Sequence, residues 1–222
     1  PSERFYMFCR CMTSKNIAKC SNYSPCVKCS VNRSFAVIPH QKPTENPLFV
    51  GNRLPIPEED MLSTTRNTPL RVAANRGASG IDGQIATACG WAMGHRQPTI
   101  ILLGDLSAIH DLNSLLLFRE SPVPMTLIIL NNDGGGIFSM LPISKQKDVF
   151  EGFFGTPHGC EFSKVAAMFD LSYCQPENLE QLQKSFQEAW LSNKSSLIEV
   201  KTDREQTAAH LLAWQDHVKN HA

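Results

Sequence analysis

Short apolar runs recur along the chain, and each run ends at a polar or turn-forming residue. The two clearest occupy residues 100–104 and 125–131. Continuous apolar runs of about four to eight residues, bounded by turn residues, are typical of strands buried on both faces of a parallel sheet. Shorter runs at residues 48–52, 70–74 and 196–200 have the same character. The pattern therefore predicts five strands.

Between these strands the apolar positions change to helical spacing. A small-residue-rich segment from Ile81 to about Met93 predicts a closely packed helix, and residues 111–120 and 161–169 predict two more. Pro176 is expected to open a longer helix, and the last twenty residues predict a polar terminal helix. In that longer helix, apolar residues recur at spacings of three, four and four: Leu179, Leu182, Phe186 and Trp190. Strands that alternate with helices predict the α/β class, with a doubly wound parallel sheet.

The first 47 residues differ in composition from the rest of the chain. Residues 1–47 carry seven Lys and Arg but only two acidic residues, and no helical or strand period is visible in them. We interpret them as a basic, Cys-containing extension or linker without regular structure. Residues 48–222 form the predicted α/β domain.

Charge and apolar content exclude some classes of function. The formal net charge of the 222 residues is zero, so nothing favours a nucleic-acid partner. No apolar run approaches the roughly 20 residues of a membrane span. Five of the eight cysteines lie in the first 29 residues, and Cys26 and Cys29 form a CxxC pair. Zinc sites usually combine two such pairs, so unselected cysteine richness is favoured over a zinc module.

Two polar residues follow the two clearest strands. Gly104-Asp105 ends the first run, and Asn132 follows the second after 26 intervening residues, 106 to 131. Ligands of open α/β sheets bind at the carboxyl ends of the strands. A carboxylate and an amide oxygen suit Mg²⁺, which also takes waters and substrate phosphates. On spacing, the carbonyl of Gly134 is a third candidate ligand.

Other polar loops have more than one interpretation. The segment 134–136 has three glycines that permit a diphosphate to approach, although alone it is equally typical of a turn after a strand. For residues 75–80, spacing favours a tight turn with a solvated Arg76 over a carboxylate-binding arginine. His158 can transfer a proton in principle, but a structural role is more common for a loop histidine near aromatic residues.

Several blocks together carry a family resemblance. They are residues 48–52, 75–83, 104–107, 111–113, 131–135, 137–139 and 154–158. In this order they resemble the C-terminal part of the 2-succinyl-5-enolpyruvyl-6-hydroxy-3-cyclohexene-1-carboxylate (SEPHCHC) synthases, the MenD family, over about residues 48–215. The Gly-Asp and Asn pair is shared by thiamine diphosphate (TPP) enzymes generally. Residues 75–83 and 137–139 are more specific to this synthase.

The resemblance implies an activity and its partners. Members of the family are TPP- and Mg²⁺-dependent transferases, with Mn²⁺ as the alternative metal. They decarboxylate 2-oxoglutarate and add the resulting carbanion to isochorismate in menaquinone or phylloquinone biosynthesis. It also implies a homo-oligomer when complete, in the cytoplasm of a bacterium or the plastid of a plant or alga.

Site residues are carried over by matching position. Asp105, Asn132 and the Gly134 carbonyl resemble the metal ligands. The residues that resemble the cofactor-binding set are Ile81, Asp105, Leu106, Ser107, Asn132, Gly134, Gly135 and Ile137. Three residues resemble the substrate-binding residues of the family: Arg76, Phe138 and Leu141. For Arg76, the resemblance reverses the preference from spacing and favours a role as a carboxylate ligand.

The chain departs from the family in two respects. Arg53 and Pro57 stand where the family has a serine and an arginine that face the substrate. The glutamate that activates the cofactor belongs to an N-terminal pyrimidine-binding domain, which residues 1–47 are too short to hold. We therefore name no certain catalytic residue, and expect an incomplete portion that is inactive alone and exposes Ile81, Ile137, Phe138 and Leu141. An acetolactate-synthase-like enzyme and a non-catalytic derivative are the alternatives.

Overall fold

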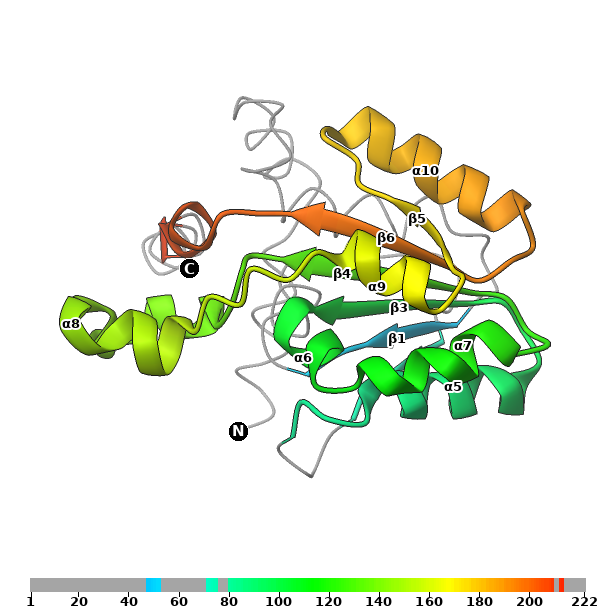
Figure 1. Ribbon diagram of the computed structural model, residues 1–222, viewed down its shortest axis with the longest axis horizontal. Coiled ribbons are helices and arrows are strands. Elements are labelled where there is room, and N and C mark those ends of the chain that lie inside the picture. Colours follow the sequence, from blue (N-terminus) through cyan, green and yellow to red (C-terminus); the bar gives the residue numbers. More distant parts are fainter. Residues whose placement is uncertain (1–46, 53–70, 76–79, 210–211, 214–222) are drawn as a thin grey trace, which may run out of the picture.

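A computed structural model describes residues 47–52, 71–75, 80–209 and 212–213 of the chain. The expectations for the N-terminal extension with its CxxC pair, and for Arg53, Pro57 and Arg76, lie outside these residues. Figure 1 shows a twisted sheet with helices on both sides.

All strands of the described sheet are parallel. Their order is β2-β1-β3-β4-β6-β5. They are β1 Leu48–Val50, β2 Val72–Ala73, β3 Thr99–Gly104, β4 Met125–Asn131, β5 Ser172–Cys174 and β6 Ser196–Lys201. The predicted α/β class with a parallel sheet is confirmed, and so are the five predicted strands. The sixth, β5, was not predicted, because its three residues at the edge contain no apolar run.

The side chains of alternate residues in the central strands pack into two hydrophobic cores, one on each face of the sheet. Ile101 and Leu103 of β3 pack in one buried cluster, and Ile100 and Leu102 pack in the other. Helices α5 (Gln84–His95), α7 (Leu115–Glu120) and α9 (Phe162–Met168) cover the first face, and α10 (Leu179–Leu191) covers the second. This arrangement explains why β3 and β4 are apolar at nearly every position, since a parallel sheet covered on both faces has no solvent-facing side.

Some helix boundaries differ from the prediction. A short helix, α6 (Asp105–Ile109), begins directly after β3, and a 3₁₀ turn, η3 (Leu112–Ser114), separates it from α7. Asp105, which was expected only to follow the strand, is therefore the first residue of a helix. Helix α10 begins at Leu179 and not at Pro176, because the side chain of Asn178 accepts the N–H of Gln181 and caps the helix there. The terminal helix occupies residues 204–209 and 212–213 within the described part.

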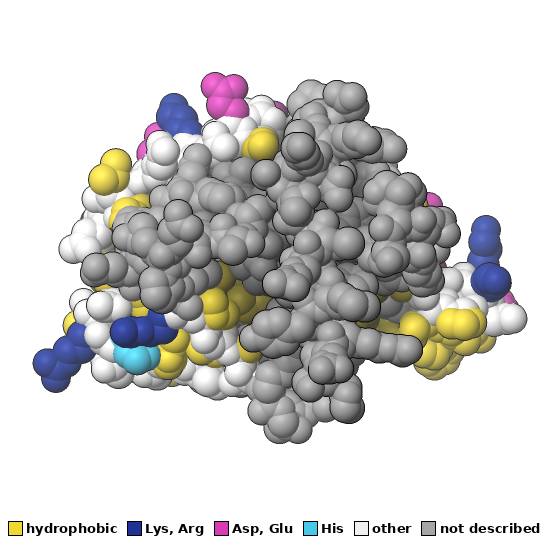
Figure 2. All heavy atoms as spheres, turned by 180° about the vertical axis from the view of Figure 1, so that it is seen from behind, with side chains coloured by type: hydrophobic (Ala, Val, Ile, Leu, Met, Phe, Trp, Pro, Cys, Tyr) yellow, Lys and Arg dark blue, Asp and Glu magenta, His cyan; other side chains and the backbone are white. Residues whose placement is uncertain are grey.

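Residues 136–155 form a projection beyond the carboxyl ends of the strands (Figure 1). It contains η4 (Gly136–Met140), η5 (Pro142–Lys145), α8 (Lys147–Phe150) and the π-helical turn η6 (Glu151–Gly155). Hydrophobic side chains gather on this end of the molecule (Figure 2), where Leu141 and Phe153 are 48% and 77% exposed. Across the described residues, no helix has the length and apolar character that crossing a membrane requires.

Candidate functional site

The carboxyl ends of β3 and β4 bring Asp105 and Asn132 together. These strands are neighbours, and Gly104 pairs with Leu130 in their register. The Asp105 side chain is buried, with Oδ2 accepting the N–H of Asn132 at 3.1 Å and the N–H of Gly134 at 2.9 Å. The two segments that the sequence singled out therefore touch, and the Asp105 carboxylate links the end of β3 to the turn after β4.

The two oxygens of the Asp105 carboxylate have different environments. Oδ2 also lies 3.2 Å from Nε2 of His158, whereas Oδ1 accepts the N–H of Leu106 at 2.7 Å. Each carboxylate oxygen has about two lone-pair directions, so Oδ1 retains the capacity to bind a cation. Burial raises the pKa of Asp105, and the hydrogen bonds from the Gly134 N–H, the His158 ring and the Leu106 N–H oppose that shift. A cation at this position would favour the charged carboxylate.

Asn132, whose backbone N–H donates to Asp105, also carries a side-chain oxygen that can act as a ligand. Its Oδ1 is buried and has no hydrogen-bond partner among the described residues. A buried polar atom without a partner costs free energy, and a metal ligand is one recognised reason for it. The described residues assemble no group of three His, Cys, Asp or Glu side chains that can hold a metal. A cation at Asp105 would therefore depend on amide and carbonyl oxygens, the ligands that Mg²⁺ accepts.

Close packing against the backbone requires two of the three glycines after Asp133, Gly134 and Gly135. A Cβ on Gly134 would overlap the carbonyl of Gly155, and one on Gly135 would overlap the carbonyl of Phe154. Gly134 also has a φ of 132°, which residues with a side chain rarely adopt. The Gly135 N–H donates to the Gly155 carbonyl at 2.7 Å. Packing of the turn against η6 therefore explains the glycines more directly than the approach of a diphosphate does.

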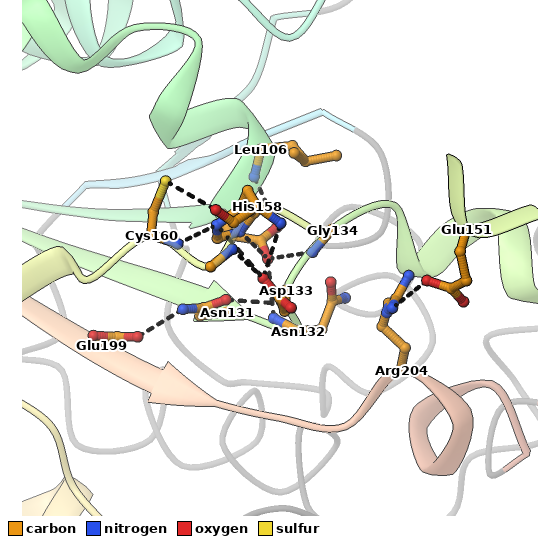
Figure 3. A network of polar contacts seen from close by, with 12 residues as sticks. Leu106, Asn131, Asn132, Asp133, Gly134, Glu151, His158, Cys160, Glu199 and Arg204 are labelled. Carbon is orange, nitrogen blue, oxygen red and sulfur yellow. Dashed lines mark hydrogen bonds and ion pairs between the residues drawn. The ribbon is translucent and has the colours of Figure 1, made fainter. Parts of the chain in front are cut away.

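Asp133 fastens the loop 156–160 to this turn. Its Oδ1 accepts the backbone N–H groups of His158 at 3.0 Å and of Gly159 at 2.8 Å. Both hydrogen bonds lower the pKa of Asp133 below its ordinary value, and the bond from Gly159 is the largest cause. Asp133 itself has a positive φ of 57°, a conformation that Asp tolerates better than most residues. Figure 3 shows how the two loops converge.

A second buried chain of hydrogen bonds supports the same turn from β6. Glu199, which is 1% exposed, accepts Nδ2 of Asn131 at 2.6 Å and the hydroxyl of Tyr173 at 2.5 Å. Asn131 in turn accepts the N–H of Asp133 on its own Oδ1 at 2.9 Å. Burial and the neighbouring Glu199 raise the pKa of Tyr173. The hydrogen bond to Glu199 therefore fixes the side chain of Asn131, and Asn131 in turn fixes the turn that carries Asn132.

The other predicted site residues lie around this turn. Leu106 and Ser107 occupy the first turn of α6, and Ile137 and Phe138 lie in η4. Ile81 lies three residues before α5. Of the apolar residues expected to be exposed, Leu141 is exposed, whereas Ile81, Ile137 and Phe138 are half-buried. Their roles toward a cofactor or substrate stay predictions.

Asp133, His158 and Glu199 belong to the polar network but are not among the predicted site residues. Asp133 stands between the two candidate ligands Asn132 and Gly134, and the sequence favours a structural role for His158. Glu199 had a visible signal, since it is the one charged residue of the apolar run 196–200. An acidic side chain within a buried strand requires partners, so it marks a polar network.

Comparisons with known proteins identify the family of the chain. The family model "Thiamine pyrophosphate enzyme, C-terminal TPP binding domain" matches residues 61–200. The SEPHCHC synthase of Rubrobacter xylanophilus is 44% identical over 167 residues, which are 75% of this chain and 29% of that synthase. The SEPHCHC synthase of Aeromonas salmonicida is 47% identical over 170 residues, 75% of this chain and 30% of that protein. The chain thus spans about 30% of the length of these relatives.

Solved structures show the same fold at low identity. Benzoylformate decarboxylase from Polynucleobacter necessarius has a TM-score of 0.69 at 18% identity, and the match covers 79% of this chain and 33% of that chain. A putative thiamin diphosphate-dependent enzyme from Mycobacterium smegmatis has a TM-score of 0.64 at 19% identity, covering 78% of this chain and 31% of that one.

The expected resemblance to the SEPHCHC synthases is confirmed by these relatives. The family match runs across residues 61–200, which is more than half of the 222 residues. It includes β3, Asp105, β4 and the turn that carries Asn132. The chain belongs to the family of thiamine pyrophosphate enzymes, as their C-terminal TPP-binding domain.

Proposed function

We propose that this chain provides the diphosphate- and metal-binding part of a SEPHCHC synthase. The complete enzyme would decarboxylate 2-oxoglutarate and join the product to isochorismate, in menaquinone or phylloquinone biosynthesis. The observation that carries the proposal is the partnerless buried Oδ1 of Asn132, a residue whose backbone N–H donates to the Asp105 carboxylate. The identity of 42–47% to synthases of this one activity supports the choice of reaction.

The residues at the site fit a divalent cation. Oδ1 of Asp105, Oδ1 of Asn132 and the carbonyl of Gly134 are oxygen ligands, which suit Mg²⁺ or Mn²⁺. The site supplies one negative charge, and a diphosphate would supply the remainder. This charge balance favours binding of the metal together with TPP over binding of the metal alone.

The chain's own residues would position the cofactor and exclude water. TPP, when bound, supplies an electron sink for decarboxylation, and the protein supplies orientation and electrostatics. We assign contact with the cofactor to Ile81, Leu106, Ser107, Gly135 and Ile137. The half-buried placement of Ile81 and Ile137 leaves part of each side chain accessible for such contact.

Substrate contacts are assigned to a second group of residues. Phe138 and Leu141 lie in the projection, where the Phe138 ring packs edge-on against Phe154 at 5.7 Å. Their apolar side chains suit the wall of a reaction site. Arg76, which lies outside the described residues, is assigned to a substrate carboxylate because guanidinium groups bind carboxylates through two parallel hydrogen bonds.

The missing catalytic parts would come from elsewhere in the complete enzyme. The matched relatives are more than three times as long as the stretch they share with this chain. We propose that a pyrimidine-binding domain, on another segment or chain, covers the cofactor and supplies the activating glutamate. A homo-oligomer is the expected assembly.

A chimaera tests the proposed reaction. Residues 48–222 would replace the corresponding C-terminal part of the Aeromonas salmonicida synthase, to which the chain is 47% identical. The chimaera should bind TPP with Mg²⁺ and consume 2-oxoglutarate together with isochorismate, as followed by product mass. A chimaera that binds TPP but turns over pyruvate, and not 2-oxoglutarate, would contradict the assignment of substrate. The matched control is the same chimaera with Asn132→Leu, which should lose turnover.

A further inference from the structure

His158 reaches the candidate metal site from a loop far along the chain. Its ring is 11% exposed, and Nε2 lies 3.2 Å from Oδ2 of Asp105, across 53 positions of sequence. The ring also packs edge-on against Phe162, with ring centroids 6.3 Å apart and an interplanar angle of 81°. The contact with Phe162 and the approach of Nε2 to the Asp105 carboxylate together define the orientation of the ring.

The backbone assigns the tautomer of this ring. Nδ1 lies 2.9 Å from the backbone N of Cys160, which donates its N–H to that nitrogen. An Nδ1 that accepts an N–H carries no proton of its own, so the proton of the neutral ring is on Nε2. Asp133 Oδ1, 3.6 Å from Nδ1, does not require a proton there, because it already accepts two backbone N–H groups. Nε2–H therefore donates to Asp105.

Backbone hydrogen bonds that do not involve the His158 ring fasten the loop to Asp133. They are donated by the backbone N–H groups of His158 and Gly159. The ring accepts the Cys160 N–H and packs against Phe162 within this part of the chain, and it also donates to Asp105, which lies outside the loop. A role confined to loop structure therefore leaves the hydrogen bond to Asp105 unexplained.

The hydrogen bond from His158 acts on Asp105, which is the candidate metal ligand. The other donors to Oδ2 are the N–H groups of Asn132 and Gly134, which belong to a single turn. His158 adds a third donor from a separate loop, so the carboxylate is held from two directions and its plane is fixed. With Oδ2 engaged by these donors, Oδ1 is the oxygen that remains to bind a cation.

We propose that His158 is a positioning residue, which holds the Asp105 carboxylate through Nε2–H and thereby sets the affinity of the site for the divalent cation. This inference rests on the proposed metal and diphosphate site. It predicts that His158 affects metal binding without contacting the metal. Hydrogen bonds to ligating carboxylates usually change metal affinity by about 10- to 100-fold when they are removed.

Metal-binding measurements test the proposal on the 222-residue chain. Binding of Mn²⁺ in the presence of TPP is followed by the loss of the free-Mn²⁺ signal in electron paramagnetic resonance. His158→Phe keeps a ring against Phe162 but lacks both the Nε2 donor and the Nδ1 acceptor for the Cys160 N–H, and it should weaken Mn²⁺ binding by about 10-fold or more. His158→Gln places an amide N–H at similar reach and should recover most of the affinity. His110→Gln, on an exposed histidine, is the control and should bind as the wild type does.

The outcomes separate this proposal from the function on which it rests. Wild-type affinity in His158→Phe, or an equal loss in His158→Phe and His158→Gln, would overturn the positioning role alone. A wild-type chain that binds no Mn²⁺ with TPP would overturn the proposed function and this inference with it. Should His158→Phe fail to fold, long-range ¹H–¹⁵N correlation spectra of the wild type still decide, since a proton on Nδ1 would contradict the proposal and a proton on Nε2 would support it.

Discussion

Glu199 allows a quantitative prediction about the support behind the site. Glu199→Leu removes the acceptor for Nδ2 of the buried Asn131. A buried donor left without a partner costs about 1–3 kcal/mol of stability. The Tyr173 hydroxyl avoids that loss, because Oε1 of Gln175 lies 3.0 Å away and can accept its proton. The expected destabilisation is therefore about 1–3 kcal/mol, the value for a single orphaned donor.

Glu199→Gln separates the hydrogen bonds from the charge. The amide Oε1 still accepts from Asn131, and its Nε2 faces the Tyr173 hydroxyl, which then donates to Gln175. Because neutral bonds replace charge-assisted ones, the expected loss is about 1 kcal/mol. The exposed Glu188→Gln on α10 is the control and should stay within about 0.5 kcal/mol of the wild type.

Urea unfolding followed by circular dichroism measures these free energies. TPP binding in the presence of Mg²⁺, measured by calorimetry on the folded variants, should weaken in Glu199→Leu, because Asn131 then holds the turn less firmly. A Glu199→Leu variant that matches the wild type in both stability and binding would refute the reasoning.

Three further predictions follow from the packing and the thiols. Gly134→Ala should destabilise the protein by about 2–6 kcal/mol in chemical denaturation, because its positive φ contributes about 1–3 kcal/mol and overpacking against the Gly155 carbonyl contributes about 1–3 kcal/mol. The control Gly90→Ala, at an open helical position, should stabilise the protein by about 0.5–1 kcal/mol. Equal effects of the two substitutions would contradict the packing account. Burial raises the pKa of Cys89 from 9.0 to about 12, so native Cys89 should resist iodoacetamide at pH 8, which peptide mass mapping checks. Because the folded thiol keeps a proton that the unfolded thiol loses above pH 9.0, stability should fall as pH rises from 9.0 toward about 12, and a denaturation midpoint that rises over this range would argue against it.

The central strands could be predicted from the sequence because their apolar runs are long. Strands β3, β4 and β6 are buried on both faces, and this environment demands continuous apolar character. The edge strand β5 has only Ser172, Tyr173 and Cys174, and it pairs with β6 alone. Its position depends on backbone pairing with a strand more than twenty residues later, which local periodicity does not express.

The candidate site was predictable where its residues follow strands. Asp105 and Asn132 come directly after β3 and β4, so the parallel sheet itself brings them together. His158 and Glu199 reach the site from a loop and from β6, respectively. Their partners lie 53 and 68 positions away in the sequence. Contacts between such distant segments depend on the folded arrangement of the loops, and spacing along the chain does not encode them.

Cofactor binding by an Asn132 variant tests the central claim most directly. Asn132→Leu keeps the shape of the side chain and removes an oxygen that has no hydrogen-bond partner in the described structure, so folding should be unaffected. Titration calorimetry would compare TPP binding with and without Mg²⁺ in the wild type, in Asn132→Leu and in the exposed control Asn113→Leu. We expect Mg²⁺ to strengthen TPP binding in the wild type and the control but not in Asn132→Leu. An undiminished effect of Mg²⁺ in a folded Asn132→Leu chain would contradict the account.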